Sequence, residues 1–150
     1  MVIQYREKTA NVQEIYEHLM ECKNSFNPPL DQTVNIGDYS KKIFDKSVTF
    51  EAWFDQKLIG CVAAYFNDLE KFSGFITNVS VSGDFTGKGI GSQLLHNCIE
   101  YAQKNRFKEI VLEVSPKSRG AIQLYRSFNF QENGSKNNLL VMKHILNHSI

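Results

Sequence analysis

The stretch Phe85-Thr86-Gly87-Lys88-Gly89-Ile90-Gly91-Ser92 decides how this chain folds and what it can bind. Its three glycines follow an apolar run over 73–82 and precede a segment, 88–105, whose apolar residues recur at helical spacing. The stretch therefore predicts a strand, a tight turn and a helix. The start of a helix presents unpaired N–H groups and a partial positive charge, and Lys88 adds a full charge. We therefore expect the turn to hold a phosphate or pyrophosphate group.

Other glycine-rich loops that bind phosphate have different spacings. A Walker A loop requires glycine at position 82 and serine or threonine at position 89, where this chain has Ser82 and Gly89. The dinucleotide fingerprint of Rossmann folds, Gly-x-Gly-x-x-Gly, also differs from Gly87-x-Gly89-x-Gly91. A strand-to-helix turn without a ligand is the alternative that the loop alone leaves open.

The composition predicts a single domain over residues 1–150. Hydrophobic residues make up 42% of the chain and include eleven phenylalanines, which is enough for a core without disulfides. Lysine and arginine number 17 against 16 acidic residues, without a basic stripe, so we expect neither nucleic acid nor a membrane as partner. The chain has no apolar segment of membrane-spanning length, and its N-terminus is typical of a strand rather than a signal peptide. We expect a cytoplasmic protein.

Cysteine and histidine are the residues to consider for disulfides and metals. Cys22, Cys61 and Cys98 are odd in number and widely spaced, so we expect buried free thiols, as in a reducing cytosol. His144 and His148 stand four residues apart, a spacing that binds metals on a helix, but here they fall at the end of a predicted strand. We therefore expect no metal site.

Hydrophobic periodicity and turn residues predict the remaining elements. Helices are expected at about 11–20 (with Asn11 as N-cap), 36–44, 88–105 and 118–127, and strands at 2–7, 47–55, 57–67, 73–82, 108–115, 128–131 and 139–142. Turns are expected at Asp55-Gln56 and Asn133-Gly134. Hairpins in the first half and a βαβ crossover in the second predict an α/β (α+β) fold with a mixed sheet of about six to seven strands and helices on both faces.

Two motifs in the second half of the chain carry a family resemblance. Val79-Ser80-Val81 precedes Thr86-Gly87-Lys88-Gly89-Ile90-Gly91, and Ser118-Arg119-Gly120-Ala121 precedes Tyr125 and Phe128-Asn129-Phe130. Together they make residues 48–146 resemble the GNAT family of acetyl-CoA-dependent N-acetyltransferases, whose acyl-CoA loop reads Arg/Gln-x-x-Gly-x-Gly/Ala. The chain departs from the family pattern at Thr86, where Arg or Gln is usual, and at Ser118, where Asn is usual. The resemblance implies a single GNAT-like domain with a mostly antiparallel sheet.

The resemblance also implies a reaction and its residues. The reaction is direct transfer of an acetyl group from acetyl-CoA to a primary amine of a small molecule, with no metal. The implied cofactor-binding residues are Val79, Val81, Thr86, Gly87, Lys88, Gly89, Ile90, Gly91, Ser92, Ser118, Ala121 and Tyr125. The Val79 N–H would face the thioester carbonyl and the Val81 N–H the pantetheine arm, while a helix cap is the other role open to Ser118.

Two side chains are expected to move protons. The resemblance implies Tyr125 as the general acid, a role open to a phenol because its ordinary pKa near 10 keeps it protonated at neutral pH. Helical periodicity alone favours the alternative, a packing aromatic. Glu113, a carboxylate in an otherwise apolar strand, is the expected base. An exposed position, or a salt bridge to Lys117 or Arg119, is the alternative for Glu113, and a water chain is the alternative base.

The acceptor is the least defined part of the prediction. The segments at about 25–46, 67–72 and 133–138 are expected to form its wall, and they carry Phe26, Leu30, Asp31, Asp38, Tyr39, Asp68, Glu70 and Phe72. This mixture suits a small cationic amine or an amino sugar, with a protein N-terminus or lysine as the alternative acceptor. An acyl-CoA-binding sensor or interaction domain without catalysis is the alternative function, because of Thr86 and Ser118. A homodimer is also expected from the resemblance.

Overall fold

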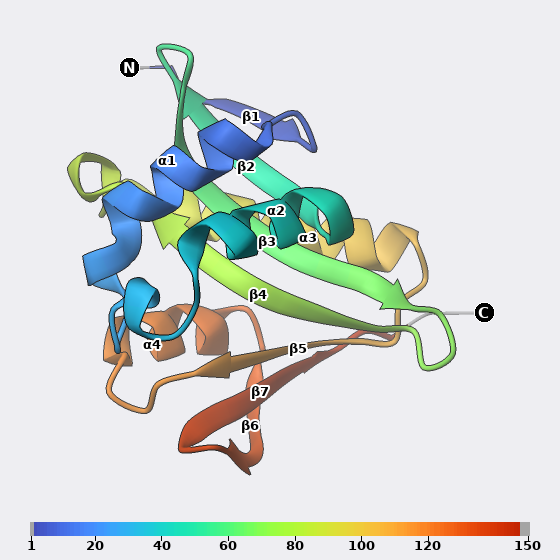
Figure 1. The fold of residues 1–150 in the computed structure, drawn as a ribbon. Helices are drawn as coiled ribbons and strands as arrows, with labels where there is room; N and C mark the ends of the chain where they lie inside the picture. The colour runs from blue at the N-terminus through green and yellow to red at the C-terminus, as the bar shows by residue number, and fades with distance from the viewer. Residues whose placement is uncertain (1, 148–150) are drawn as a thin grey trace.

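In the computed structural model, which describes residues 2–147, the chain forms a seven-stranded sheet with the strand order β1-β2-β3-β4-β5-β7-β6 (Figure 1). The strands are β1 (Gln4–Glu7), β2 (Val48–Phe54), β3 (Lys57–Asp68), β4 (Ser73–Val81), β5 (Glu109–Val114), β6 (Gln131–Lys136) and β7 (Leu139–Ile145). The α-helices are α1 (Val12–Cys22), α2 (Ile36–Lys46), α3 (Ile90–Lys104) and α4 (Arg119–Ser127). Neighbouring strands are antiparallel except β4 and β5, which are parallel. The predicted mixed, mostly antiparallel sheet is confirmed.

Two local sequence signals, a helix cap and a hairpin turn, have the structures that were predicted. The Asn11 side chain accepts a hydrogen bond from the Glu14 N–H (2.8 Å), and the Glu14 side chain accepts one from the Asn11 N–H (2.9 Å), which is a capping box at the start of α1. The β2–β3 hairpin turns at Asp55 and Gln56, whose φ angles are 50° and 62°. Such left-handed pairs match the twist of two paired strands.

The turn predicted at Asn133-Gly134 is wrong, because both residues lie within β6. The chain reverses instead at Asn137 and Asn138, whose φ angles are 52° and 67°. Asparagine tolerates the left-handed region, so two consecutive asparagines form this turn without glycine. The register of β6 with β7 shifts around Gly134, whose φ of 89° therefore belongs to a bulge inside the strand.

Hydrophobic residues form a core on each face of the sheet. One core lies against α3 and α4 and includes Leu94, Leu95 and Ile110. The other lies under α1 and α2 and includes Ile15 and Ile43. Helices therefore cover both faces, as predicted (Figure 1). None of the helices between residues 2 and 147 has the length and apolar character needed to cross a membrane.

The three cysteines, Cys22, Cys61 and Cys98, are buried and free, as predicted. Burial raises the pKa of each thiol above its ordinary value. The thiols are therefore protonated at neutral pH and weakly reactive, since the thiolate is the nucleophilic form. Cys98 and Cys61 fill space in the two cores, and Cys22 is buried beside His18.

Glu51 on β2 is a buried carboxylate that joins two parts of the chain. It has no exposed surface and accepts hydrogen bonds from the N–H groups of Thr9 and Ala10, the hydroxyls of Thr9 and Thr49, and the indole of Trp53. Burial acts to raise the pKa of this carboxyl, but the hydrogen bonds outweigh burial and hold the pKa below its ordinary value. Glu51 thus ties the segment before α1 to the sheet as a fully bonded anion.

Candidate active site

Strands β4 and β5 run side by side for part of their length and then separate (Figure 1). Their pairing ends at Ile76 and Leu112, whereas β4 continues to Val81 against β3 on its other side. The β3–β4 register skips Thr77, which forms a bulge. A bulge bends its strand and increases the local twist. The result is a gap between the carboxyl ends of β4 and β5.

Two backbone N–H groups of β4 face this gap. The Ser82 N–H donates to the Ile59 carbonyl on β3 (2.8 Å), and successive N–H groups of an extended chain point to opposite sides. Val79 and Val81 lie an odd number of residues before Ser82. Their N–H groups therefore point away from β3, toward the side that β5 has left. This is the direction that the family resemblance requires for binding a thioester and a pantetheine arm.

The glycine loop leads from β4 into α3. Gly87 and Gly89 have φ angles of 75° and 77°, a region that glycine adopts without strain. A Cβ at either position would meet no atom within 4 Å, so the space beside them is open. The Gln93 N–H donates to the Gly89 carbonyl (3.1 Å), and the N–H groups of residues 90–92 precede the helical ladder. The loop and the helix start therefore offer several donors to one anionic group.

The remaining predicted residues of this loop differ in whether their side chains are available to a ligand. The Thr86 hydroxyl donates to the carbonyl three residues earlier (3.0 Å), so it closes the loop and its proton is already in use. The Lys88 side chain is exposed, and the Ile90 side chain is buried in the core. Gly91 lies beside α4, and a Cβ there would be in ordinary contact with Leu124 at 3.7 Å. Ile90 and Gly91 can therefore contact a ligand only through their backbone.

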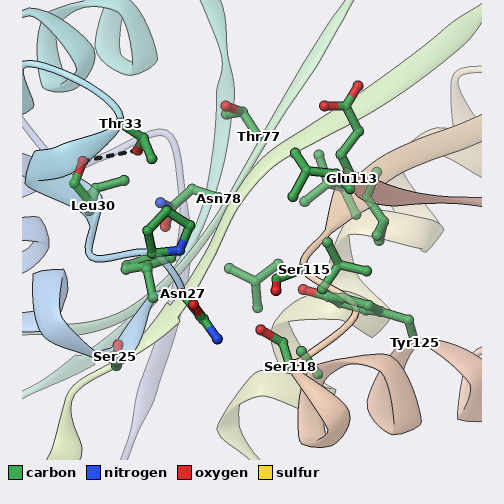
Figure 2. Close-up of a pocket in the computed structure, with 18 residues that line it drawn as sticks. Ser25, Asn27, Leu30, Thr33, Thr77, Asn78, Glu113, Ser115, Ser118 and Tyr125 are labelled. Carbon is green, nitrogen blue, oxygen red and sulfur yellow. Dashed lines mark hydrogen bonds between the residues drawn. The ribbon is translucent and has the colours of Figure 1, made fainter. Parts of the chain in front are cut away.

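A cavity of about 330 Å³ lies at the gap between β4 and β5 (Figure 2). Its walls come from the chain between α1 and α2, from β4 and β5, and from the start of α4. Residues that the sequence predicted for the site line it together, namely Val79, Glu113, Ser118, Ala121 and Tyr125. The fold thus brings both predicted catalytic residues to the lining of one cavity.

Tyr125 on α4 has its ring in the core and its hydroxyl toward the cavity (Figure 2). The residue is 6% exposed, and its ring centroid lies 5.9 Å from that of Phe130. Burial raises the pKa of Tyr125 to about 12, so the phenol keeps its proton throughout the physiological range. A protonated hydroxyl beside the gap can donate a hydrogen bond or a proton.

Ser118 occupies the N-cap position of α4, but its side chain makes no capping hydrogen bond. The hydroxyl lies on the cavity side, near Ser115, as Figure 2 shows. Of the two roles that the sequence left open for Ser118, the capping role is therefore wrong. Its hydroxyl faces the space where a ligand can enter.

Glu113 approaches the gap from the other face of the sheet. Leu112 and Val114 point into the core against α3 and α4, and side chains alternate along a strand, so Glu113 points to the opposite face. It lines the cavity and also a second groove on that face. Figure 2 shows its carboxylate extending away from Tyr125. The gap is therefore flanked by a phenol on one side and a carboxylate on the other.

The acceptor wall predicted from the sequence is correct only in part. Phe26 and Leu30 line the cavity, but the predicted acidic residues do not, and Asp68 lines the second groove instead. Asn78 and Ser115, which the sequence did not indicate, do line it. Among the described residues around the cavity, one is acidic, namely Glu113, and none is basic.

Of the two histidines near the C-terminus that the sequence analysis considered as metal ligands, the structure describes one. His144 lies with Nδ1 2.8 Å from the Phe128 carbonyl oxygen, and His148 is outside the described residues. In the part of the chain that is described, no group of three or more His, Cys, Asp or Glu side chains is arranged to hold a metal ion.

The fold and the site geometry correspond to a known family. The model of the acetyltransferase (GNAT) family matches residues 12–130, which include β4, the glycine loop and α4. The chain therefore belongs to the GNAT acetyltransferase family. The match begins at residue 12, whereas the resemblance read from the sequence motifs began at residue 48, so the match extends it to α1 and α2.

Individual relatives support this assignment. An uncharacterized N-acetyltransferase of Methanocaldococcus jannaschii is 33% identical over 75 residues, which are 49% of this chain and 33% of that protein. The chain spans between 26% and 61% of the length of the curated relatives that it matches. A PaiA N-acetyltransferase from Thermoplasma acidophilum, solved in complex with coenzyme A, has a TM-score of 0.77 at 15% identity, over 97% of this chain and 99% of that one. A GNAT acetyltransferase from Elizabethkingia anophelis, solved with acetyl-CoA bound, has a TM-score of 0.70 at 22% identity, over 96% and 98%.

Proposed function

We propose that the protein transfers an acetyl group from acetyl-CoA directly to the primary amine of a small molecule. The observation that carries this proposal is the gap between β4 and β5, where one cavity combines backbone donors of β4 with Tyr125 and Glu113. Acetyl-CoA would lie on the α3–α4 side, with its pyrophosphate at the N–H groups of residues 87–92. Two solved structures of the same fold, one in complex with coenzyme A and one with acetyl-CoA bound, support acetyl-CoA as the donor.

The reaction forms a C–N bond and breaks a C–S bond. The amine nitrogen attacks the thioester carbonyl carbon, and the Val79 N–H stabilises the negative charge that develops on the carbonyl oxygen. As the C–S bond breaks, the Tyr125 hydroxyl gives its proton to the sulfur. Glu113 takes, directly or through water, the proton that converts the ammonium group to the neutral amine before it attacks. After the C–N bond forms, the nitrogen loses a second proton, which returns through water to the Tyr125 phenolate. Acid and base act from opposite faces of the sheet, so each reaches a different atom of the reacting pair.

The cavity suits an amine that arrives as a cation. Glu113 attracts an ammonium group, and no basic residue among those described around the cavity repels it. The neutral polar and apolar walls and the volume of about 330 Å³ favour a small molecule, which includes an amino sugar. A protein N-terminus or lysine is the alternative acceptor. A cytoplasmic location and a homodimer belong to the same proposal.

A non-catalytic acyl-CoA sensor is the alternative function. Thr86 and Ser118, which depart from the family pattern, favour it. The Tyr125 hydroxyl favours catalysis, because a packing aromatic has no need of a hydroxyl directed into a cavity (Figure 2). Calorimetric titration with acetyl-CoA, followed by an assay for acetylation of primary amines, separates the two functions: a sensor binds without transfer.

The variant Gly89→Leu should lose affinity for acetyl-CoA by at least about 30-fold in a calorimetric titration. Leucine at a φ of 77° costs roughly 1–2 kcal/mol of stability, and its side chain occupies the open space beside the helix start. The wild-type protein should bind with micromolar affinity. Absence of binding by the wild type would overturn the proposed function itself.

Gly134→Leu is the matched control for this titration. Gly134 also has a positive φ (89°) and no atom within 4 Å of an added Cβ, but it lies on the exposed strand β6. The two variants should lose similar amounts of stability, whereas Gly134→Leu should bind acetyl-CoA as the wild type does. Unchanged affinity in Gly89→Leu would remove the glycine loop from the cofactor site.

The variant Glu113→Gln should lower kcat roughly 100-fold at neutral pH and flatten the acidic limb of the pH–rate profile, because it cannot accept a proton. Stopped-time assays from pH 5 to 9 measure both effects. Glu109→Gln is the control, since Glu109 lies four residues earlier on the same strand and accepts a hydrogen bond from the Ser73 hydroxyl outside the cavity (2.7 Å). A wild-type profile in Glu113→Gln would assign the base to water.

A further inference from the structure

A chain of buried hydrogen bonds runs from α1 to β4 beside the cavity. His18 Nε2 lies 2.9 Å from Ser80 Oγ, and the Ser80 hydroxyl donates to Asn78 Oδ1 (2.8 Å). Because the single hydroxyl proton of Ser80 goes to Asn78, the bond between His18 and Ser80 must use the proton on Nε2. Burial lowers the pKa of His18 to about 4, so the ring is neutral at pH 7 and has such a tautomer. The chain therefore holds Asn78 with its oxygen toward Ser80.

The other end of the Asn78 amide is buried without a hydrogen-bond partner. Asn78 is 3% exposed, and its Nδ2 makes no hydrogen bond to any residue between 2 and 147. Tyr39 is close: burial raises the pKa of its phenol to about 12, and the Thr77 and Asn78 side chains offset part of that rise. The Tyr39 hydroxyl donates to the Thr77 carbonyl (2.7 Å) and its oxygen could still accept, but no hydrogen bond of ordinary geometry joins it to Asn78 Nδ2.

A buried donor without a partner costs roughly 1–3 kcal/mol, so it calls for a reason. Asn78 lines the cavity, and Figure 2 shows its amide extending from β4 toward the segment 25–33 that forms the opposite wall. It lies next to Val79, but its side chain is on the other face of the strand, the face from which Glu113 approaches. The free donor is therefore on the acceptor side of the gap.

We propose that Asn78 Nδ2 binds an oxygen of the acceptor, and that the acceptor is a primary amine with a hydroxyl or carbonyl group on the carbon next to the amine-bearing carbon. An N–H donor cannot bind an ammonium group, so its partner must be an oxygen lone pair. The position of Asn78 beside Val79 places that oxygen close to the attacking nitrogen. Amino sugars and α-aminoacyl amides share this chemistry, whereas simple alkylamines lack it. The inference rests on the proposed acetyl transfer.

The test compares acceptors in the wild type and in Asn78→Leu, which keeps the side-chain size and removes the donor. The acceptors are n-butylamine, glucosamine and alaninamide, each with saturating acetyl-CoA. The wild type should show a kcat/KM for glucosamine or alaninamide at least about tenfold above that for butylamine, the effect of one hydrogen bond. Asn78→Leu should remove this preference, because its kcat/KM for glucosamine or alaninamide falls at least about tenfold more than its kcat/KM for butylamine.

A second variant and a control complete the experiment. Asn78→Asp keeps the oxygen that Ser80 bonds and removes the donor, so it should lose the same preference if Asn78→Leu does not fold. Asn97→Leu changes a half-buried asparagine on α3 that lines a different groove, and it should leave the preference intact. A preference for glucosamine alone identifies the sugar as the source of the oxygen, and one for alaninamide alone identifies the aminoacyl group.

Three outcomes would overturn the inference. Equal losses for butylamine and the oxygen-bearing amines in both Asn78 variants would show that Asn78 only supports the fold. A wild type without any preference would remove the inference and leave acetyl transfer in place. A wild type that binds acetyl-CoA but acetylates none of the three amines would overturn both the inference and the small-amine acceptor, while the cofactor site would stand.

Discussion

Tyr125→Phe is expected to lower kcat roughly 100- to 1,000-fold while the KM for acetyl-CoA changes less than about threefold. Phenylalanine keeps the ring contact with Phe130 and removes only the hydroxyl that faces the cavity. The thiolate of CoA then has to leave without a proton from the protein. Steady-state kinetics with a primary amine acceptor and varied acetyl-CoA measures both constants.

The pH dependence of kcat gives a second test of Tyr125. Because burial raises the pKa of Tyr125 to about 12, the acid form is fully present below that pKa and is lost only as the pH rises through it. The wild type should therefore show no alkaline loss of kcat from this group below about pH 10. An alkaline limb near pH 8 that disappears in Tyr125→Phe would contradict the assignment.

Tyr101→Phe is the matched control for the loss of a hydroxyl. The Tyr101 ring contacts Phe50 and Phe66 in the core under α3 and lines a different groove. Its kcat should stay within about twofold of the wild type. Equal losses in the two variants, or a normal kcat in Tyr125→Phe, would exclude Tyr125 as the general acid.

Glu51→Gln is expected to lower the free energy of unfolding by about 2–4 kcal/mol and Tm by roughly 5–15 °C. Each carboxylate oxygen of Glu51 accepts at least two hydrogen bonds, from the N–H groups of Thr9 and Ala10 and from side-chain donors. The amide NH₂ of glutamine replaces one of these oxygens with a donor, so whichever way it turns, two or more donors lose their acceptor, at least one of them buried. Urea unfolding at pH 7 and thermal melting measure the loss.

The contribution of Glu51 to the free energy of unfolding should decrease on acidification. The pKa of Glu51 is lower in the folded state than in the unfolded state, so its contribution is present above the unfolded value, near 4.5, and is lost as the pH falls through the folded value. The difference in stability between wild type and Glu51→Gln should therefore be constant from pH 6 to 8 and shrink on acidification below about pH 4.5. A difference that grows on acidification would contradict this account.

Glu70→Gln is the control for removing one negative charge. Glu70 is exposed at the end of the β3–β4 connection, and its substitution should change the free energy of unfolding by less than about 0.5 kcal/mol. A similar loss in both variants would mean that net charge, rather than the buried hydrogen bonds of Glu51, stabilises the fold.

Strand β4 shows why its site residues were only partly predictable. Its carboxyl-terminal half alternates polar and apolar residues, a pattern typical of a strand whose polar face is in solvent. In the fold, Asn78 and Ser80 are buried at 3% and 5% exposure, while Val79 is half-buried. The reason is non-local: α1 covers the polar face and supplies His18 as a partner, and the departure of β5 opens the other side.

The prediction of the acceptor wall was only partly correct for a similar reason. The sequence identified the chain segments around the cavity but not which of their side chains face it. Phe26 and Leu30 do, whereas the acidic residues predicted with them do not. Exposed loop residues have no periodicity that reports their direction, since no regular element fixes it.

The sequence by itself determined the order of the elements, the capped start of α1, the hairpin at Asp55-Gln56 and the glycine loop that opens α3. These features depend on residues close together in the chain, through capping, turn chemistry and helical spacing. Tertiary structure alone decided that β4 and β5 separate after Ile76, that Glu113 and Tyr125 reach one cavity from opposite faces, and that Asn78 is buried with a free donor. Those features arise because the bulge at Thr77 and the pairing of strands far apart in sequence set which backbone and side-chain groups meet.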